Sequence, residues 1–286
     1  MANSTHRPGP PGKGQMTRDP ERGSSPPRPM APLTTLAVGG AGSSLPGLVR
    51  RSWTLLDFIL IWLAGAVVSA LAAEAARSLE LPDDLRLLVT LAGQFVGILL
   101  MFAILYVRRR ADGPITFGLA TGDAKFVLLG IGFQIAANIL MQPIARMVYP
   151  EDAGPPQMIA EIIGRSSTHA AVRIAFFASA ALLAPLTEEL LYRGVLFQAT
   201  RRWGAWVAII TTSVVFTAVH LLGLDPENFA GSAAIVLPPL FVLAILLGWL
   251  TERTGRLGPA FFVHSGFNLL AALILLIPPE LLQLPT

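Results

Sequence analysis

The chain of 286 residues is 53% hydrophobic and only 14% charged, with a mean hydropathy of +0.61. Since a soluble globular protein carries about 25% charged residues, this composition excludes an ordinary soluble enzyme and a disordered protein. The absence of cysteine excludes disulfides, thiolate metal sites and cysteine nucleophiles. The net charge of +3 fits basic loops beside anionic lipid, so the lipid bilayer rather than nucleic acid is the expected partner.

The first 50 residues differ from the rest of the chain. They are rich in proline, glycine, serine and arginine, and they hold nine of the 23 prolines. Such a segment cannot bury enough apolar surface to offset the entropy lost on ordering. We therefore expect a disordered tail over residues 1–50 and a membrane-embedded domain over residues 51–286.

Apolar windows follow along the remainder of the chain. A membrane helix needs about 20 mostly apolar residues. The windows are 55–73, 87–107, 126–148, 172–200, 205–222, 235–250 and 259–277. They predict an all-α fold, a polytopic transmembrane helix bundle of about seven spans. Small and amide residues within the spans predict close helix packing at Gly93, Gly97, Gly130 and Gly132, and interhelical hydrogen bonds from Gln134 and Asn138.

Basic residues occupy every second connection between the windows. They are Arg50 and Arg51, then Arg108 to Arg110 with Lys125, then Arg201 and Arg202, then Arg253 and Arg256. The intervening connections carry acidic residues instead. By the positive-inside rule, this alternation predicts a cytoplasmic N-terminus. The composition, with only two lysines, is typical of a bacterial chain from a GC-rich genome, so we expect an integral protein of a bacterial plasma membrane.

Three short strings place ionisable or amide groups inside apolar windows. The fourth window contains Glu188, Glu189 and Arg193, the fifth ends on Phe216-Thr-Ala-Val-His220, and the seventh contains His264-Ser-Gly-Phe-Asn268. Charged groups within hydrocarbon are costly, so they are candidates for function by default.

The spacing within these strings predicts which side chains share a helix face. Glu189 and Arg193 are four residues apart and can pair on one face. Glu188 lies about 100° around the helix from Glu189, which leaves its carboxylate free for another face. His264 and Asn268 are also four residues apart and share a face.

The connection between the fourth and fifth windows sets the relative depth of two candidates. If these windows form a hairpin that turns near Gly204, Glu188 and His220 are equally distant in sequence from the turn. They then lie at equal depth on neighbouring helices, as a shared site requires.

The ordered strings Glu-Glu-x-x-x-Arg, Phe-x-x-x-His and His-x-x-x-Asn resemble the CPBP family of intramembrane proteases. That family includes the type II CAAX prenyl endopeptidases and bacterial bacteriocin-processing or immunity proteins. The resemblance covers about residues 172–275, which would form the catalytic core. It implies an intramembrane endopeptidase that cleaves membrane-associated, in some members lipidated, protein or peptide substrates.

The resemblance also implies roles for the candidate residues. Glu188, beside His220, would activate a water as general base, while His264 and Asn268 would donate to the oxyanion. Glu189 and Arg193 would hold Glu188 in position. A zinc ion bound by Glu188, His220 and His264 is the alternative within the same site, although no His-Glu-x-x-His string supplies two ligands from one helix. The metal-free mechanism is the one we expect.

Two other functions are compatible with polar groups in a helix bundle. A proton-coupled transporter relays protons through intramembrane Glu and His, but the windows show neither an inverted repeat nor paired broken helices. A non-catalytic scaffold or regulatory protein is the other alternative. It would be expected if one of the residues implied by the resemblance were missing, and none is missing.

Overall fold

The computed structural model describes Met1 and residues 53–109, 118–149 and 170–276. The chain divides into two units, Met1–Leu48 and Val49–Thr286, and apart from Met1 all described residues belong to the second. The tail predicted over residues 1–50 therefore lies outside the described residues, except for Met1. Every element in the described part is helical, which confirms the predicted all-α class.

The first three spans are long helices. They are α1 (Leu55–Ser78), α2 (Asp83–Arg109) and α3 (Phe126–Val148), and α3 follows a short turn η1 (Asp123–Lys125). A capping box starts α1, because Thr54 and Asp57 each accept a hydrogen bond from the other's backbone N–H.

The fourth span is one helical run whose turns change width. It consists of α5 (Ala170–Ala178), the wide π-helical turn η2 (Ser179–Leu183), α6 (Ala184–Glu188), a second π-helical segment η3 (Glu189–Leu196) and α7 (Phe197–Arg201). The predicted turn near Gly204 is confirmed. Gly204 has a φ of 121°, a conformation that suits glycine, and α8 begins directly after it.

The remaining helices complete the bundle. They are α8 (Ala205–Val219), the short turn η4 (His220–Gly223), α9 (Phe229–Thr254) and α10 (Gly258–Leu276). Six helices are long and apolar enough to cross a membrane, and the helix from Gly258 is a shorter apolar one. The predicted bundle of about seven spans is thus confirmed.

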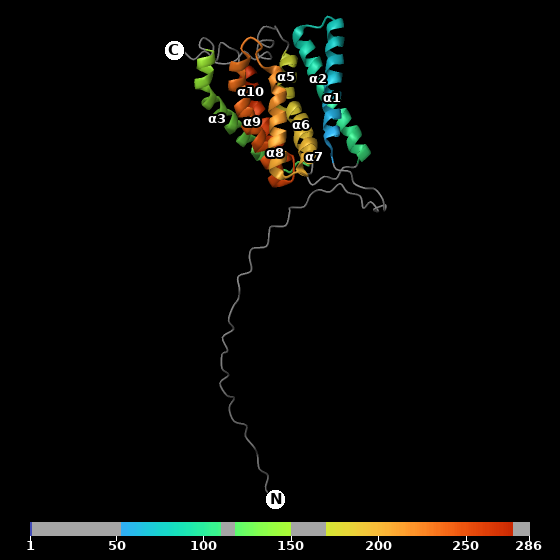
Figure 1. Cartoon of the computed structure of the whole chain (residues 1–286), viewed down its shortest axis with the longest axis vertical. Coiled ribbons are helices and arrows are strands. Elements are labelled where there is room, and N and C mark those ends of the chain that lie inside the picture. Colours follow the sequence, from blue (N-terminus) through green and yellow to red (C-terminus); the bar gives the residue numbers. More distant parts are fainter. Residues whose placement is uncertain (2–52, 110–117, 150–169, 277–286) are drawn as a thin grey trace. The chain divides into compact units, whose positions relative to one another are not determined.

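Helix pairs pack through glycines. Helix α1 packs along α2, α3 along α10, and α8 along α9. Figure 1 shows α1 and α2 together at one edge of the bundle and α3 at the other, with α5 to α10 between them. On α2, a Cβ at Gly97 would stand 2.5 Å from the carbonyl oxygen of Ala64, and one at Gly93 would stand 2.7 Å from the Cβ of Ala72. Both predictions of close packing are confirmed.

Helix α3 approaches α10 even more closely. A Cβ at Gly130 would lie 1.9 Å from the carbonyl oxygen of Val263, so only glycine permits this contact. The same prediction was wrong for Gly132, where a Cβ would meet nothing within 4 Å, because this residue points away from α10. An ion pair joins the N-terminal ends of α3 and α10. The guanidinium of Arg256, just before α10, donates to both carboxylate oxygens of the buried Asp123, just before α3, at 2.6 and 3.0 Å.

Candidate active site

The fourth span places two adjacent carboxylates where α6 meets η3. Glu188 is the last residue of α6 and Glu189 is the first residue of the wide turn η3. Pi-helical turns are rare and occur frequently at functional sites, because they redirect side chains within an otherwise regular helix. Glu189 is buried, whereas the side chain of Glu188 keeps 28% of its surface exposed.

The predicted pairing of Glu189 with Arg193 is confirmed. Oε1 of Glu189 accepts from Nη1 of Arg193 at 2.9 Å, and both side chains are almost completely buried. The guanidinium also donates to the carbonyl oxygen of Ala244 on α9 at 3.2 Å and lies 4.8 Å from the ring centre of Phe216. A buried ion pair is stable only with such additional partners.

His264 on α10 lies between the two carboxylates. Its Nδ1 is 2.9 Å from Oε1 of Glu189, and its Nε2 is 3.6 Å from Oε2 of Glu188. A carboxylate can only accept, so the proton of this hydrogen bond belongs to Nδ1 of His264. Glu189 therefore fixes the orientation of the ring and directs its Nε2 edge toward the partly exposed Glu188. At 3.6 Å the second contact is longer than a direct hydrogen bond.

His220 reaches the same region through Phe216. Its Nδ1 is 2.7 Å from the carbonyl oxygen of Phe216, one helical turn earlier, and its ring lies 4.8 Å from the Phe216 ring. The ring centre of His264 lies 5.6 Å from that of the same phenyl ring, in an edge-on arrangement. Among the described residues no hydrogen bond or ion pair joins His220 to Glu188. The histidines thus share Phe216, while Glu188 faces His264.

Asn268 donates to a backbone carbonyl of the fourth span that receives no hydrogen bond from within its own helix. Its Nδ2 donates to the carbonyl oxygen of Ala180 at 3.0 Å. In a regular α-helix that oxygen would accept from the N–H of Ala184, but in η2 this N–H donates to Ser179. The next residue, Pro185, has no N–H to offer. Asn268 thereby satisfies a partly buried backbone acceptor and keeps its second amide proton for another partner.

The alternative zinc site can be tested against the donor geometry. Within the described ranges, no group of three or more His, Asp or Glu side chains lies close enough to hold a metal ion. Both ring edges of His264 already face carboxylates, and His220 contacts Phe216 instead. The side chains as arranged do not fit a three-ligand zinc site, so no step below involves a metal.

One residue of the site was not anticipated from the sequence. Tyr192 is buried, and its ring packs against Phe216 at 5.3 Å and against Phe58 of α1 at 5.8 Å. It therefore connects the site to the first span. The sequence holds no signal for this contact, since a tyrosine in an apolar window is ordinary packing material.

The comparisons with known proteins give one match, over part of the chain. Residues 170–270 match the family model described as type II CAAX prenyl endopeptidase Rce1-like. No curated protein and no solved structure gives a match. The matched segment contains Glu188, Glu189, Arg193, His220, His264 and Asn268, whereas α1 to α3 lie outside it.

Proposed function

Because the chain belongs, through residues 170–270, to the CPBP family of intramembrane proteases, we propose that it hydrolyses peptide bonds in membrane-associated proteins or peptides. The observation that carries this proposal is the contact between Glu188 and His264. The partly exposed carboxylate of Glu188 faces the Nε2 edge of His264. The other edge of this ring contacts the buried carboxylate of Glu189, which is paired with Arg193.

In the proposed reaction Glu188 is the general base. It takes a proton from a water that attacks the carbonyl carbon of the scissile bond, and the same proton then passes to the leaving amine. The carbonyl oxygen becomes negative and needs hydrogen-bond donors fixed in advance. His264, whose ring Glu189 holds in place, and the second N–H of Asn268 are the proposed donors. His220 is the proposed partner of the attacking water, since its Nε2 is not engaged by Phe216.

Glu189 and Arg193 are proposed as positioning residues. The resemblance implied that they hold Glu188 in position, but beyond their own pairing they contact His264, Ala244 and Phe216. Their proposed effect is to fix the orientation and the proton of the His264 ring, which is a common function of a carboxylate behind a catalytic histidine.

The experiment compares wild type with Glu188→Gln in proteoliposomes that contain membrane proteins from cells lacking this chain. New peptide termini, identified by mass spectrometry, should form with wild type and disappear with Glu188→Gln. The matched control is Glu74→Gln, the same change at a largely exposed surface carboxylate of α1, which should leave the termini unchanged. Identical termini from Glu188→Gln would contradict the proposal. No new termini from wild type would favour the scaffold or transporter alternatives.

The setting of the reaction is proposed together with the activity. The apolar helices and the family establish an integral membrane protein. That the membrane is a bacterial plasma membrane, and that the N-terminus is cytoplasmic, are predictions from composition and from the distribution of basic residues.

A further inference from the structure

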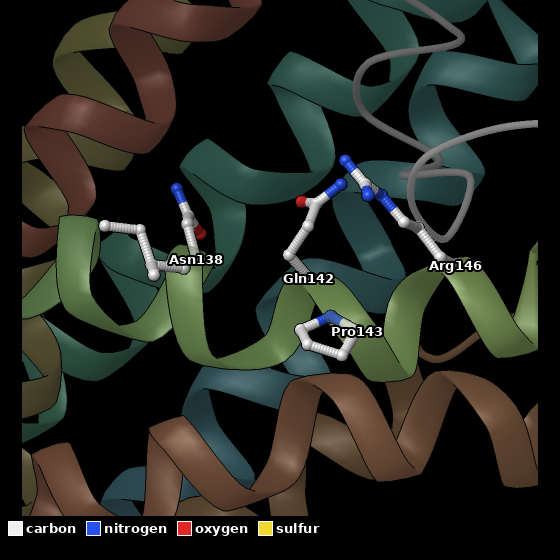
Figure 2. Close-up of a pocket in the computed structure, with 5 residues that line it drawn as sticks. Asn138, Gln142, Pro143 and Arg146 are labelled. Atoms are coloured by element: carbon white, nitrogen blue, oxygen red, sulfur yellow. The ribbon is translucent and has the colours of Figure 1, made fainter.

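The polar side chains along the second half of α3 differ in what they contact. Asn138, Gln142 and Arg146 project from one side of the helix, and the described lining of the groove beside them belongs to α3 alone (Figure 2). Gln134 donates to Oδ1 of Asn138 at 3.0 Å, so the interhelical bonds that the sequence predicted for these two residues were wrong. Tyr149, at the C-terminal end of α3, instead bonds a residue that follows α8.

The contact of Tyr149 joins two distant parts of the chain. Its hydroxyl donates to Oδ2 of Asp225 at 3.2 Å, although the two residues are 76 positions apart. Tyr149 lies just beyond the third candidate span. Burial of the hydroxyl and its bond to the Asp225 carboxylate raise the pKa of Tyr149, so it remains protonated and donates at neutral pH. Asp225 lies two residues after η4, the turn that begins with His220, so α3 contacts the connection that carries a histidine of the site.

Asp225 also holds the connection between η4 and α9 together. Its backbone N–H donates to Oγ of the buried Ser232 at 3.2 Å, and its Oδ1 accepts from the N–H of Glu227 at 2.9 Å. A carboxylate accepts through both of its oxygens, so this one group binds its own loop through Oδ1 and Tyr149 through Oδ2.

The start of α9 packs against α3 beside this bond. A Cβ at Gly231 would stand 2.2 Å from Cγ1 of Val148, the residue before Tyr149, so a side chain at this position would displace the valine. The end of α3 therefore holds the connection between α8 and α9 at two points, one apolar and one polar. We call Val148, Tyr149, Asp225 and Gly231 the α3 clasp.

The turn η4 has little packing of its own. None of its four residues is buried, and Leu221, Leu222 and Gly223 are exposed. The hydrogen bonds of a 3₁₀ turn also have poorer geometry than those of an α-helix. The orientation of η4 therefore depends on the segments at its two ends, which are α8 on one side and the connection held by the α3 clasp on the other.

His220 depends on that orientation because its ring bonds only within its own helical run. Its Nδ1 lies 2.7 Å from the carbonyl oxygen of Phe216, and its ring packs on the Phe216 ring. Among the described residues no hydrogen bond from another helix holds this ring, whereas Glu189 of the fourth span holds His264. The direction of the Nε2 edge of His220 is thus determined by the backbone where α8 passes into η4.

We propose that the bond between Tyr149 and Asp225 positions His220 for the reaction. Both are positioning residues that act through His220. They hold η4, and with it the Nε2 edge of the ring, in the direction that the attacking water requires. This inference rests on the proposed protease function, because it describes how that site holds one of its histidines. It also gives α3 a part in the site, although α3 lies outside the matched residues 170–270.

The first test follows the His220 ring and needs no turnover. The full chain in nanodiscs is labelled with carbon-13 at Cε1 of its four histidines, and His220→Gln identifies the His220 signal by nuclear magnetic resonance. Tyr149→Phe, which removes only the hydroxyl, should shift or double this signal and leave that of His264 in place. Tyr106→Phe, the same change at an exposed tyrosine of α2, should move neither signal.

The second test measures turnover of a peptide that spans a cleavage site identified from the new termini. Tyr149→Phe should lower kcat about tenfold with KM nearly unchanged, which is the factor expected for one hydrogen bond to a charged group. Asp225→Asn keeps an accepting oxygen and should retain most of kcat, whereas Asp225→Ala should lose at least as much as Tyr149→Phe. Combining Tyr149→Phe with Asp225→Ala should cost nothing further, because both remove the same bond.

A matched control for the charge is Glu227→Gln, which removes a carboxylate with an exposed side chain from the same connection. This variant should keep the kcat, the KM and the His220 signal of the wild type. Thermal unfolding verifies that each variant is folded and gives its midpoint.

The outcomes separate positioning from stability and from substrate binding. An unchanged His220 signal in folded Tyr149→Phe would overturn the inference. A raised KM at constant kcat would also overturn it and assign Tyr149 to substrate binding. A loss of kcat that disappears at temperatures well below a lowered midpoint would assign the bond to stability alone. Absence of proteolysis by the wild type would overturn the proposed function, whereas the His220 signal would still show whether the α3 clasp orients the ring.

Discussion

The polar side chains of α3 and those of the fourth span differ in burial and in the partners that they bond. In the most apolar part of residues 171–201, 39% of the residues are buried inside the protein, against 11% for the span that contains α3. Glu189 and Arg193 are enclosed and bonded to side chains and backbone of other helices. On α3, Asn138 is exposed and its side chain accepts a hydrogen bond from Gln134 of the same helix. The difference distinguishes groups that other helices enclose from groups that lie on the outside of the bundle.

The comparison predicts a large difference in stability between the two regions. Arg193→Leu should lower the free energy of unfolding by about 3–5 kcal/mol, because it leaves the buried carboxylate of Glu189 without its counter-charge. Gln142→Leu on α3 should change it by no more than about 0.5 kcal/mol. Titration with SDS in mixed micelles measures both values. Equal losses in the two variants would show that the distinction between the regions is wrong.

A second prediction concerns Asn268, which links the site to the η2 turn. Asn268→Ala should lower kcat about a hundredfold with little change in KM, as expected on losing one oxyanion donor. Ser265→Ala is the matched control, since its buried Oγ has no hydrogen-bond partner among the described residues. Steady-state kinetics on an identified substrate measure both.

The same variant separates the metal-free mechanism from the zinc alternative. A metal would polarise the carbonyl group itself, so Asn268 would matter little and a chelator would abolish activity. Full activity of Asn268→Ala, together with chelator-sensitive turnover and stoichiometric zinc in the purified protein, would replace the proposed mechanism.

The third and smallest effect tests the contact of α3 with α10, the helix that carries His264 and Asn268. Gly130→Ala should destabilise the protein by about 1–3 kcal/mol, because the new methyl group meets the backbone of α10 at Val263. Gly132→Ala, two residues away, meets nothing within 4 Å and should be neutral or slightly stabilising through better helix propensity. Thermal unfolding of the two variants gives the difference. If both behave alike, α3 does not pack on α10 through Gly130.

The bundle was largely predictable because apolar length determines membrane helices. The windows predicted for the first, third, fourth and fifth spans begin within two residues of the observed helices. The sixth was predicted to begin at residue 235 but begins at Phe229, because Asn228 caps the helix by accepting from the N–H of Gly231. A window defined by hydropathy misses such a polar start.

The site was predictable along each helix but not between helices. Spacing of four residues correctly predicted that Glu189 and Arg193 meet. Sequence reasoning placed Glu188 beside His220, whereas the contact that Glu188 makes in the structure is with His264, at 3.6 Å. The reason is geometric: residue spacing gives depth along an axis, but the direction in which a side chain meets its neighbour depends on how the helices are rotated and packed.

The wide turns of the fourth span have a consequence for its far end. Each π-helical segment has more residues per turn than an α-helix. Every residue after it therefore points in a different direction around the helix axis than it would in an uninterrupted α-helix. Arg201, which follows both segments, nevertheless meets Glu252 of α9 through two hydrogen bonds of 2.7 and 2.5 Å. The two segments thus adjust the direction in which later side chains point around the helix axis. They allow one continuous helix to direct its carboxylates toward α10 and its terminal arginine toward α9. Deleting one residue from η3 would change the direction of Arg201 relative to Glu188 and Glu189, and deleting one from η2 would change the direction of all three side chains relative to α5.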